Sequence, residues 1–340
     1  MSKTAVTTII NRNLRNFKCS EGWQNARDER YHTYRRNWHA YPTTHHVSDF
    51  PLHLDIEITN ACNLRCRMCA RTLLDATGDL PETGFMEFDF YTRLIDQGVS
   101  QGLASVKLNF LGEPLLHPRV ADMVAYAKEA GVVEVMCNTN AMLLTPKLSR
   151  DLLAAGLDSI FFSVDSIRKK VLEHIRFGSH FETVMGNIQF FLGARQQLRK
   201  TTVQVGVNMV LMENNADELD EFLAFWKPQV DRVNWSVDQH KASGSSTQAE
   251  LARGKTRLEA FCCAQLWQRL VVCVDGTCLP CCLDHRRELA VGDAYTTPIA
   301  EIWRHSPRYE VLRRLHGQGR YQDIPACHAC PFSLDEEAAC

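Results

Sequence analysis

The 340-residue sequence lacks several features that would assign it at once to a class of proteins. It has no apolar run approaching the roughly 18 residues that a membrane-spanning helix needs. It has no excess of one charge, because 38 basic and 40 acidic residues nearly cancel, so nothing indicates a nucleic-acid partner. It shows no internal repeat, and the stretch 5–10 is too short and threonine-rich for a secretory signal. We therefore expect a globular protein of about two domains in the cytoplasm, with neither membrane nor nucleic acid as partner.

Cysteine is abundant, with 14 residues. A secreted disulfide scaffold would be much shorter and would carry an export signal. We therefore expect reduced thiols, many of which hold metal, and their grouping becomes the main evidence about function.

The middle of the chain alternates between strand and helix patterns. Leu52, Leu54, Ile56 and Ile58 alternate with polar residues, which is typical of a strand. Further strands are predicted at 105–111, 132–139, 159–164, 202–211 and 231–237, with helices at 88–101, 120–127, 146–155, 181–192 and 216–227. Such interleaving predicts parallel strands with crossover helices, and six units are too few for a complete eight-fold barrel. The predicted fold class is α/β, a partial (β/α)6 TIM-like barrel followed by a small cysteine-rich domain.

Composition divides the chain into four segments. Residues 1–50 hold eight Lys/Arg against four Asp/Glu without a clear period, and we interpret them as a basic N-terminal extension packing on the next domain. The partial barrel is predicted at 51–240. The stretch 241–258, rich in Ser, Gly and charge, is predicted to be a linker. The C-terminal domain, at 259–340, contains nine of the cysteines.

Cys62, Cys66 and Cys69 form a C-x3-C-x2-C loop directly after the first predicted strand. Structural zinc sites usually take four ligands, whereas three thiolates on a four-iron cluster leave one iron open. Spacing alone leaves a zinc site with a distant fourth ligand as an alternative. The loop lies at the C-terminal end of its strand, where parallel barrels place their active sites.

Three further segments follow the next strands, and with the cysteine loop they form an ordered set: Gly112-Glu113-Pro114, Asn138-Thr139-Asn140 and Ser163-Val164-Asp165. This set resembles the radical S-adenosylmethionine (SAM) enzymes over about residues 52–240. The resemblance implies a [4Fe-4S] cluster on Cys62, Cys66 and Cys69, whose fourth iron chelates the amino and carboxylate groups of SAM. It also implies reductive SAM cleavage to a 5′-deoxyadenosyl radical that abstracts a substrate hydrogen atom, in an enclosed site.

The same resemblance implies a set of SAM-binding residues. The segment Leu111-Gly112-Glu113 matches the family's Gly-Gly-Glu, which receives the SAM amino group, with Leu111 replacing the first glycine. Asn140 matches a ribose-side position, although an alanine follows it where glycine is usual. The remaining matches are Ser163 and Arg176 for the methionine carboxylate and Asn208 for a further contact to SAM.

The later cysteines resemble a SPASM/Twitch extension over about residues 262–331. The resemblance implies one auxiliary [4Fe-4S] cluster on Cys263, Cys281, Cys327 and Cys330, although Cys262 could replace Cys263 and Cys282 could replace Cys281. The full SPASM pattern continues with more cysteines after Cys330, and here only Cys340 follows, so the shorter Twitch-like form fits better. Without this context, the separated cysteine pairs could equally form a zinc ribbon.

The candidates for direct action on a substrate are two spare thiols, Cys282 and Cys137, as hydrogen donors, and Asp238 and His240 after the sixth strand. The resemblance to Twitch-type relatives, some of which oxidise alcohols, implies an oxidoreductase or epimerase that acts on a small sugar-like or aminocyclitol-like molecule. It also implies a reducing partner such as flavodoxin or ferredoxin. Two alternatives stay open: a peptide or protein maturase, and a non-enzymatic iron–sulfur or zinc protein.

Overall fold

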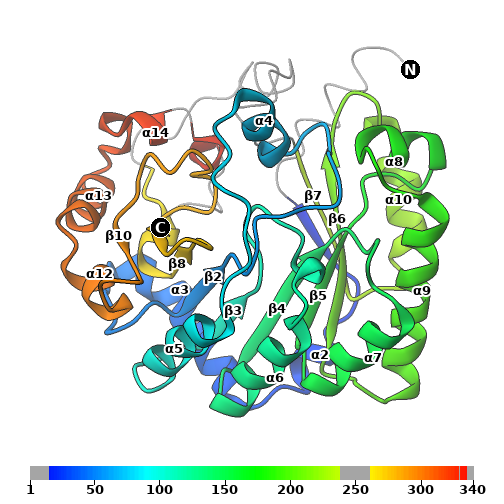
Figure 1. The fold of residues 1–340 in the computed structure, drawn as a ribbon, viewed down its shortest axis with the longest axis horizontal. Coiled ribbons are helices and arrows are strands. Elements are labelled where there is room, and N and C mark those ends of the chain that lie inside the picture. The colour runs from blue at the N-terminus through cyan, green and yellow to red at the C-terminus, as the bar shows by residue number, and fades with distance from the viewer. Residues whose placement is uncertain (1–14, 238–260, 329, 335–340) are drawn as a thin grey trace. The chain divides into compact units, whose positions relative to one another are not determined.

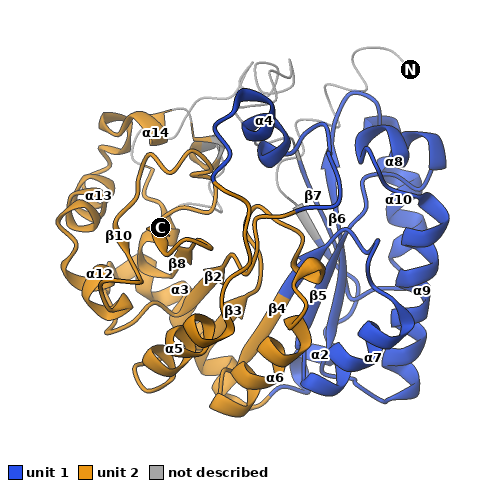
Figure 2. Ribbon diagram, viewed as in Figure 1, with its two compact units in different colours: residues 1–27, 62–81, 137–255 blue, residues 28–61, 82–136, 256–340 orange. Residues whose placement is uncertain are grey.

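The computed structural model of the protein describes residues 15–237, 261–328 and 330–334 (Figure 1). The chain divides into two compact units (Figure 2). Unit 1 comprises residues 1–27, 62–81 and 137–255, and unit 2 comprises 28–61, 82–136 and 256–340. Each unit is made of three separate stretches of the chain, so this division differs in kind from the four consecutive segments expected from composition. The boundaries of those segments stay predictions. The linker 241–258 lies outside the described residues.

Unit 1 contains a parallel group of strands in the order β5-β6-β7, extended at β7 by the antiparallel strand β1. Its elements are β1 (Arg15–Lys18), α2 (Gly22–Asn25), α4 (Ala70–Thr77), α7 (Pro146–Ala155), β5 (Ser159–Ser163), α8 (Lys169–Ile175), α9 (Phe181–Gln197), β6 (Gln204–Leu211), the 3-10 turn η2 (Ala216–Glu218), α10 (Leu219–Trp226) and β7 (Arg232–Val237). Helices α7, α9 and α10 cover one face of these strands (Figure 1). Phe162 on β5 meets Phe191 on α9 edge to face at 5.8 Å between ring centroids, which places the core between sheet and helices.

Unit 2 contains the parallel strands β4-β3-β2, continued by β8, β9 and β10. Its elements are α3 (Glu29–Thr44), β2 (His53–Ile56), α5 (Phe88–Val99), β3 (Ser105–Lys107), η1 (Pro114–Leu116), α6 (Val120–Ala130), β4 (Glu134–Thr139, whose last three residues belong to unit 1), η3 (Ala264–Trp267), β8 (Arg269–Val272), β9 (Thr277–Leu279), β10 (Gly292–Asp293), α12 (Ile299–His305), α13 (Pro307–Gly317), η4 (Tyr321–Asp323), α14 (Pro325–His328) and η5 (Pro331–Leu334). The strand β8 pairs in parallel with β2, so the cysteine-rich segment joins the same sheet as the first barrel strand.

Local sequence signals account for the helix boundaries. In α7, the Thr145 hydroxyl accepts a hydrogen bond from the Leu148 amide at 3.2 Å, and Gly156 ends the helix at a φ of 92°. In α3, the Asp28 carboxylate caps the first turn by accepting from the Tyr31 amide at 3.0 Å. These caps satisfy amide groups that the first helical turn leaves without an intrahelical partner.

All six predicted barrel strands and all five predicted helices are present, the last helix preceded by η2. In the described part of each unit, the strand order is linear rather than closed. The α/β prediction with a partial barrel is therefore confirmed. Helices α3, α4 and α8 were not predicted, and α3 shows that residues 29–44 are regular rather than irregular.

Candidate active site

In unit 1, the loop of residues 62–69 is held along the end of α8. The Arg65 amide donates to the Phe177 carbonyl oxygen and the Arg67 amide to the Ile175 carbonyl oxygen, each at 2.9 Å. Alternate side chains of the loop, Leu64, Cys66 and Met68, are buried against Ile175. Cys62 and Cys69 are half-buried. The loop therefore presents three thiols from a backbone whose position the following helix fixes.

Cys66 is the buried thiol of this loop. Burial raises its pKa to about 12, and the nearby Arg176 guanidinium opposes that rise. Arg176 Nη1 donates to Cys66 Sγ at 3.8 Å, and Arg176 Nε lies 2.7 Å from Asp165 Oδ2. A buried thiol with one adjacent cation suits a metal ligand, because coordination supplies the remaining charge that stabilises the thiolate.

Asn140 contacts the cysteine loop directly. Its Nδ2 donates to Asn63 Oδ1 at 2.9 Å, and its Oδ1 accepts from the Met142 amide at 3.0 Å. Ala141, which follows it, has a φ of 61°, a left-handed conformation that favours glycine, as the family pattern has there. The structure therefore places Asn140 against the cysteine loop and Arg176 beside Cys66, and the roles of both residues in binding SAM stay predictions.

Ser163 and Asn208 are register partners on β5 and β6. Asn208 Oδ1 accepts from Asn234 Nδ2 on β7 at 2.8 Å, so part of its hydrogen-bonding capacity is used within the sheet. Both residues are half-buried, Ser163 at the C-terminal end of β5 and Asn208 in the middle of β6. Their roles in binding SAM stay predictions.

In unit 2, the segment Leu111-Gly112-Glu113 lies close against the chain that follows β2. A Cβ atom on Gly112 would lie 2.0 Å from the Thr59 carbonyl oxygen, so only glycine fits there. The Glu113 amide donates to the Ala61 carbonyl oxygen at 2.8 Å. The Glu113 carboxylate is buried and caps η1. A buried acid held in this way could receive an ammonium group.

Glu57, directly after β2, was not singled out from the sequence. Its two carboxyl oxygens accept from the Leu111 and Val274 amides, both at 3.2 Å, and Arg287 lies 3.7 Å away. Burial raises the pKa of Glu57 to about 7. This side chain therefore links the Leu111-Gly112-Glu113 segment to the turn after β8. The sequence signal that could have identified Glu57 was an acidic residue directly after an apolar strand.

The four predicted auxiliary ligands lie in one neighbourhood of unit 2. Burial, followed by the nearby thiols of Cys330 and Cys327, raises the pKa of Cys263 well above its ordinary value. Burial, followed by the nearby thiols of Cys282, Cys263 and Cys330, does the same for Cys281. Within the described residues, no three potential ligands converge as a site for a single metal ion. A four-iron cluster would bind one thiolate at each of its irons, so four thiols in one neighbourhood suit it.

The spare thiols are in different environments. Cys262 Sγ lies 3.5 Å from His45 Nε2, whereas Cys282 contributes to the pKa of Cys263 and is close enough to the auxiliary set to remain an alternative ligand. Cys282 also packs beside the buried cluster of Val271, Cys273 and Leu279. Cys137 is buried within β4. The candidates Asp238 and His240, and the last cysteine, Cys340, lie outside the described residues.

Comparison with family models defines the class of protein. The Radical SAM superfamily model matches residues 56–226, and an iron–sulfur cluster-binding domain model, SPASM, matches residues 262–331. The chain therefore belongs to the radical SAM superfamily and carries a C-terminal SPASM domain. It is an enzyme whose cofactors are SAM, a SAM-binding [4Fe-4S] cluster and an auxiliary [4Fe-4S] cluster. The zinc and non-enzymatic alternatives are thereby set aside.

Curated relatives match about half of the chain. The tungsten-containing aldehyde ferredoxin oxidoreductase cofactor-modifying protein of Pyrococcus furiosus is 29% identical over 178 residues, which is 51% of this chain and 47% of that protein. GTP 3′,8-cyclase of Heliobacterium modesticaldum is 30% identical over 180 residues, 50% of each chain. The chain thus spans about half the length of the curated relatives it matches.

Solved structures are similar in fold over most of the chain. BtrN in complex with AdoMet and 2-DOIA covers 82% of this chain and 92% of its own, with a TM-score of 0.53 and 19% identity. AnSMEcpe with bound AdoMet covers 85% and 93%, with a TM-score of 0.62 and 14% identity. Streptococcus suis SuiB bound to its precursor peptide SuiA covers 83% and 71%, with a TM-score of 0.55 and 15% identity. At these identities the likeness establishes the fold. In the described part of the chain, no helix is long and apolar enough to cross a membrane.

Proposed function

We propose that the protein oxidises or epimerises a small polyhydroxylated molecule, such as a sugar or an aminocyclitol, at a carbon that bears a hydroxyl group. The observation that carries this proposal is the second group of thiols, four half-buried cysteines in one neighbourhood of unit 2: Cys263, Cys281, Cys327 and Cys330. Four protein ligands leave an auxiliary cluster without an open iron for SAM. Such a cluster is suited to electron transfer.

The electron count favours oxidation. Dehydrogenation of an alcohol removes two electrons and two protons, whereas abstraction of one hydrogen atom removes only one of each. The second proton must then pass to a base or to water, and the second electron needs an acceptor. The auxiliary cluster supplies that acceptor, so the predicted product is the carbonyl compound.

The residues proposed to hold SAM and its cluster are those of the family pattern. Cys62, Cys66 and Cys69 hold the [4Fe-4S] cluster, which with SAM supplies the hydrogen-abstracting radical. Glu113 receives the SAM ammonium group. The other proposed contacts to SAM are Leu111, Gly112, Asn140, Ser163, Arg176 and Asn208. A reductant is required, and we propose a flavodoxin or a ferredoxin in that role.

Epimerisation is the close variant, and it requires a hydrogen donor on the opposite face of the substrate. Cys282 and Cys137 are the proposed donors, and Asp238 or His240 the proposed base for oxidation. Incubation in deuterated water separates the two outcomes. Solvent deuterium at the reacting carbon of the product would refute oxidation, whereas a carbonyl at that carbon would refute epimerisation.

A second candidate function is peptide modification, favoured by the similarity in fold to SuiB bound to its precursor peptide SuiA. SuiB is matched over only 71% of its length, whereas BtrN in complex with 2-DOIA is matched over 92%. The difference favours a small molecule. The decisive experiment measures 5′-deoxyadenosine formed anaerobically with SAM, a reductant and two panels, one of sugars and aminocyclitols and one of peptides encoded near the gene. Stimulation by a peptide alone would overturn the proposed function.

A further inference from the structure

We propose that Asp165 is a positioning residue that holds Arg176 against Cys66, and that the Arg176 contact sets the reduction potential of the SAM-binding cluster. The inference rests on the proposed assignment of Cys66 as a cluster ligand. It assigns Arg176 a contact with the Cys66 sulfur atom, which is a different role from its expected contact with the methionine carboxylate of SAM.

One guanidinium group bridges an acid and a sulfur atom. Arg176 Nε lies 2.7 Å from Asp165 Oδ2, and Nη1 donates to Cys66 Sγ at 3.8 Å. The Arg176 side chain is only 10% exposed and the Asp165 side chain is fully buried. The planar guanidinium places Nε beside Asp165 as an ion pair and Nη1 beside Cys66, two contacts that the single ammonium group of lysine cannot make together.

Backbone hydrogen bonds hold Cys66 next to Arg176. The cysteine loop is hydrogen-bonded on both sides of this residue, because the Ile175 and Phe177 carbonyl oxygens accept the Arg67 and Arg65 amides. Cys66 is the loop residue between those two bonds. The hydrogen bonds that align the cysteine loop with the end of α8 therefore also place the Arg176 guanidinium beside the Cys66 sulfur.

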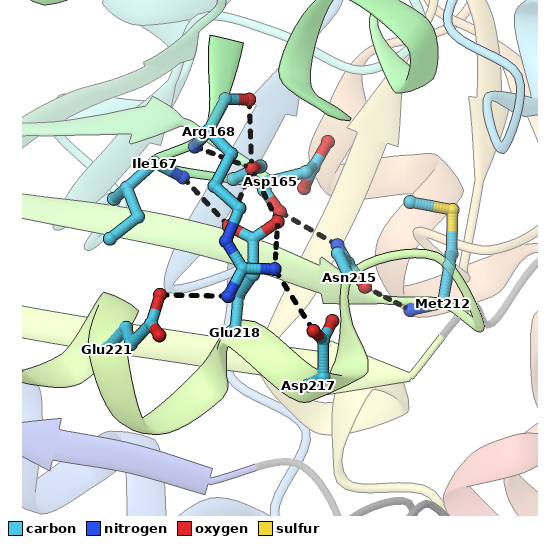
Figure 3. A network of polar contacts seen from close by, with 9 residues as sticks. Asp165, Ile167, Arg168, Met212, Asn215, Asp217, Glu218 and Glu221 are labelled. Carbon is cyan, nitrogen blue, oxygen red and sulfur yellow. Dashed lines mark hydrogen bonds and ion pairs between the residues drawn. The ribbon is translucent and has the colours of Figure 1, made fainter. Parts of the chain in front are cut away.

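Asp165 is held more firmly than an ordinary ion-pair partner (Figure 3). Its Oδ1 accepts from the Val210 amide at 2.8 Å, and its main-chain carbonyl oxygen accepts from Asn215 Nδ2 at 2.8 Å. The turn that follows is anchored by the buried Glu218 carboxylate, which accepts from the Ile167 amide at 3.2 Å. These bonds aim Oδ2 at Arg176, so the acid acts as a fixed anchor for the guanidinium.

The consequence for the cluster follows from charge. Reduction adds an electron to the cluster, and a hydrogen bond and a cation at a ligand sulfur stabilise that added charge. Arg176 should therefore raise the reduction potential, which makes the cluster easier to reduce. Asp165 acts through Arg176: its own negative charge would lower the potential, but without it the guanidinium is no longer held at the sulfur.

The test compares R176Q, R176K and D165N with the wild-type holoenzyme, with R67Q as the matched control. Arg67 lies in the same loop, and its Nε donates to the His174 carbonyl oxygen at 2.8 Å. The readout is the midpoint potential from an anaerobic redox titration followed by electron paramagnetic resonance. The SAM-binding cluster is identified as the signal that shifts when SAM is added. Iron content and circular dichroism report whether each variant is loaded and folded.

The expected result is a lower potential in R176Q, an intermediate one in R176K and an almost unchanged one in R67Q. In D165N, the amide placed at Oδ2 no longer attracts Arg176, so the potential should fall toward that of R176Q. A rise in D165N would show that Asp165 acts only by its own charge and would overturn the positioning role. An unchanged potential in R176Q would overturn the whole inference. If D165N fails to fold, the potential of R176K is the remaining test, and a value equal to that of the wild type would overturn the inference. A wild-type protein without the SAM-sensitive signal would instead refute the cluster assignment.

Discussion

Glu57 makes a prediction that can be worked through from its surroundings. The carboxyl is fully buried between the Leu111 and Val274 amides, with Arg287 at 3.7 Å and Cys273 and Asp275 also nearby. Burial raises its pKa from 4.5 to about 7, and Asp275 adds to that rise, whereas the two amides and Arg287 oppose it. The perturbation is the neutral substitution E57Q.

The raised pKa makes stability fall as pH rises. In the unfolded chain Glu57 releases its proton near pH 4.5, whereas in the folded protein it keeps the proton up to about pH 7. Between these values the folded state binds more protons, so the free energy of unfolding decreases with increasing pH. At about 1.4 kcal/mol per pKa unit, the loss from this one group totals about 3 kcal/mol.

The assay is anaerobic urea unfolding of wild type and E57Q at about pH 5 and about pH 8. The difference in unfolding free energy between the two proteins should change by about 3 kcal/mol in favour of E57Q at the higher pH. E129Q, which neutralises an exposed carboxylate on α6, is the control and should show little such change. An equal difference between wild type and E57Q at both pH values would refute the reasoning.

Three further predictions follow from the same structure. His53 is buried and its pKa is lowered to about 4, so H53Q should remove a gain in stability of about 3 kcal/mol as pH rises from about 4 to 6.5 in a urea titration. G112A would put a Cβ atom 2.0 Å from the Thr59 carbonyl oxygen, so it should lower the unfolding free energy by about 1–3 kcal/mol. It should also weaken SAM binding, as measured by calorimetry. An unchanged unfolding free energy and an unchanged affinity for SAM would contradict the close contact. C66A should abolish 5′-deoxyadenosine formation, whereas C330A should spare part of it and block substrate turnover, as separate assays of SAM cleavage and product would show; equal losses in both would contradict separate roles.

The sequence predicted the alternating strands and helices because their apolar periodicity is strong. It did not predict α3, whose residues are mostly polar and which buries only Tyr31, Tyr34 and Pro42. The parallel pairing of β8 with β2 was also not foreseen, because a short apolar run carries no information about its partner strand. Pairing of this kind is decided by packing across the whole sheet.

The cysteine motifs indicated the cofactors correctly, but their polar surroundings were missed for a physical reason. Alternation along 52–58 suggests one polar face, yet Asp55 and Glu57 are as buried as the leucines beside them. Asp55 is compensated by Lys107 at 2.5 Å and Arg269 at 3.2 Å. These cations come from other strands, so only the fold reveals that the acids are paired. Asp165 in unit 1 is likewise a buried acid, and its partner Arg176 comes from the end of α8.

The measurement that tests the central claim most directly is iron content combined with SAM cleavage in the anaerobically reconstituted protein. Two four-iron clusters predict about eight irons per chain and reductant-dependent formation of 5′-deoxyadenosine. The double variant C327A/C330A should retain about four irons and some cleavage. A wild-type protein with about four irons or none, and with no 5′-deoxyadenosine, would contradict the account.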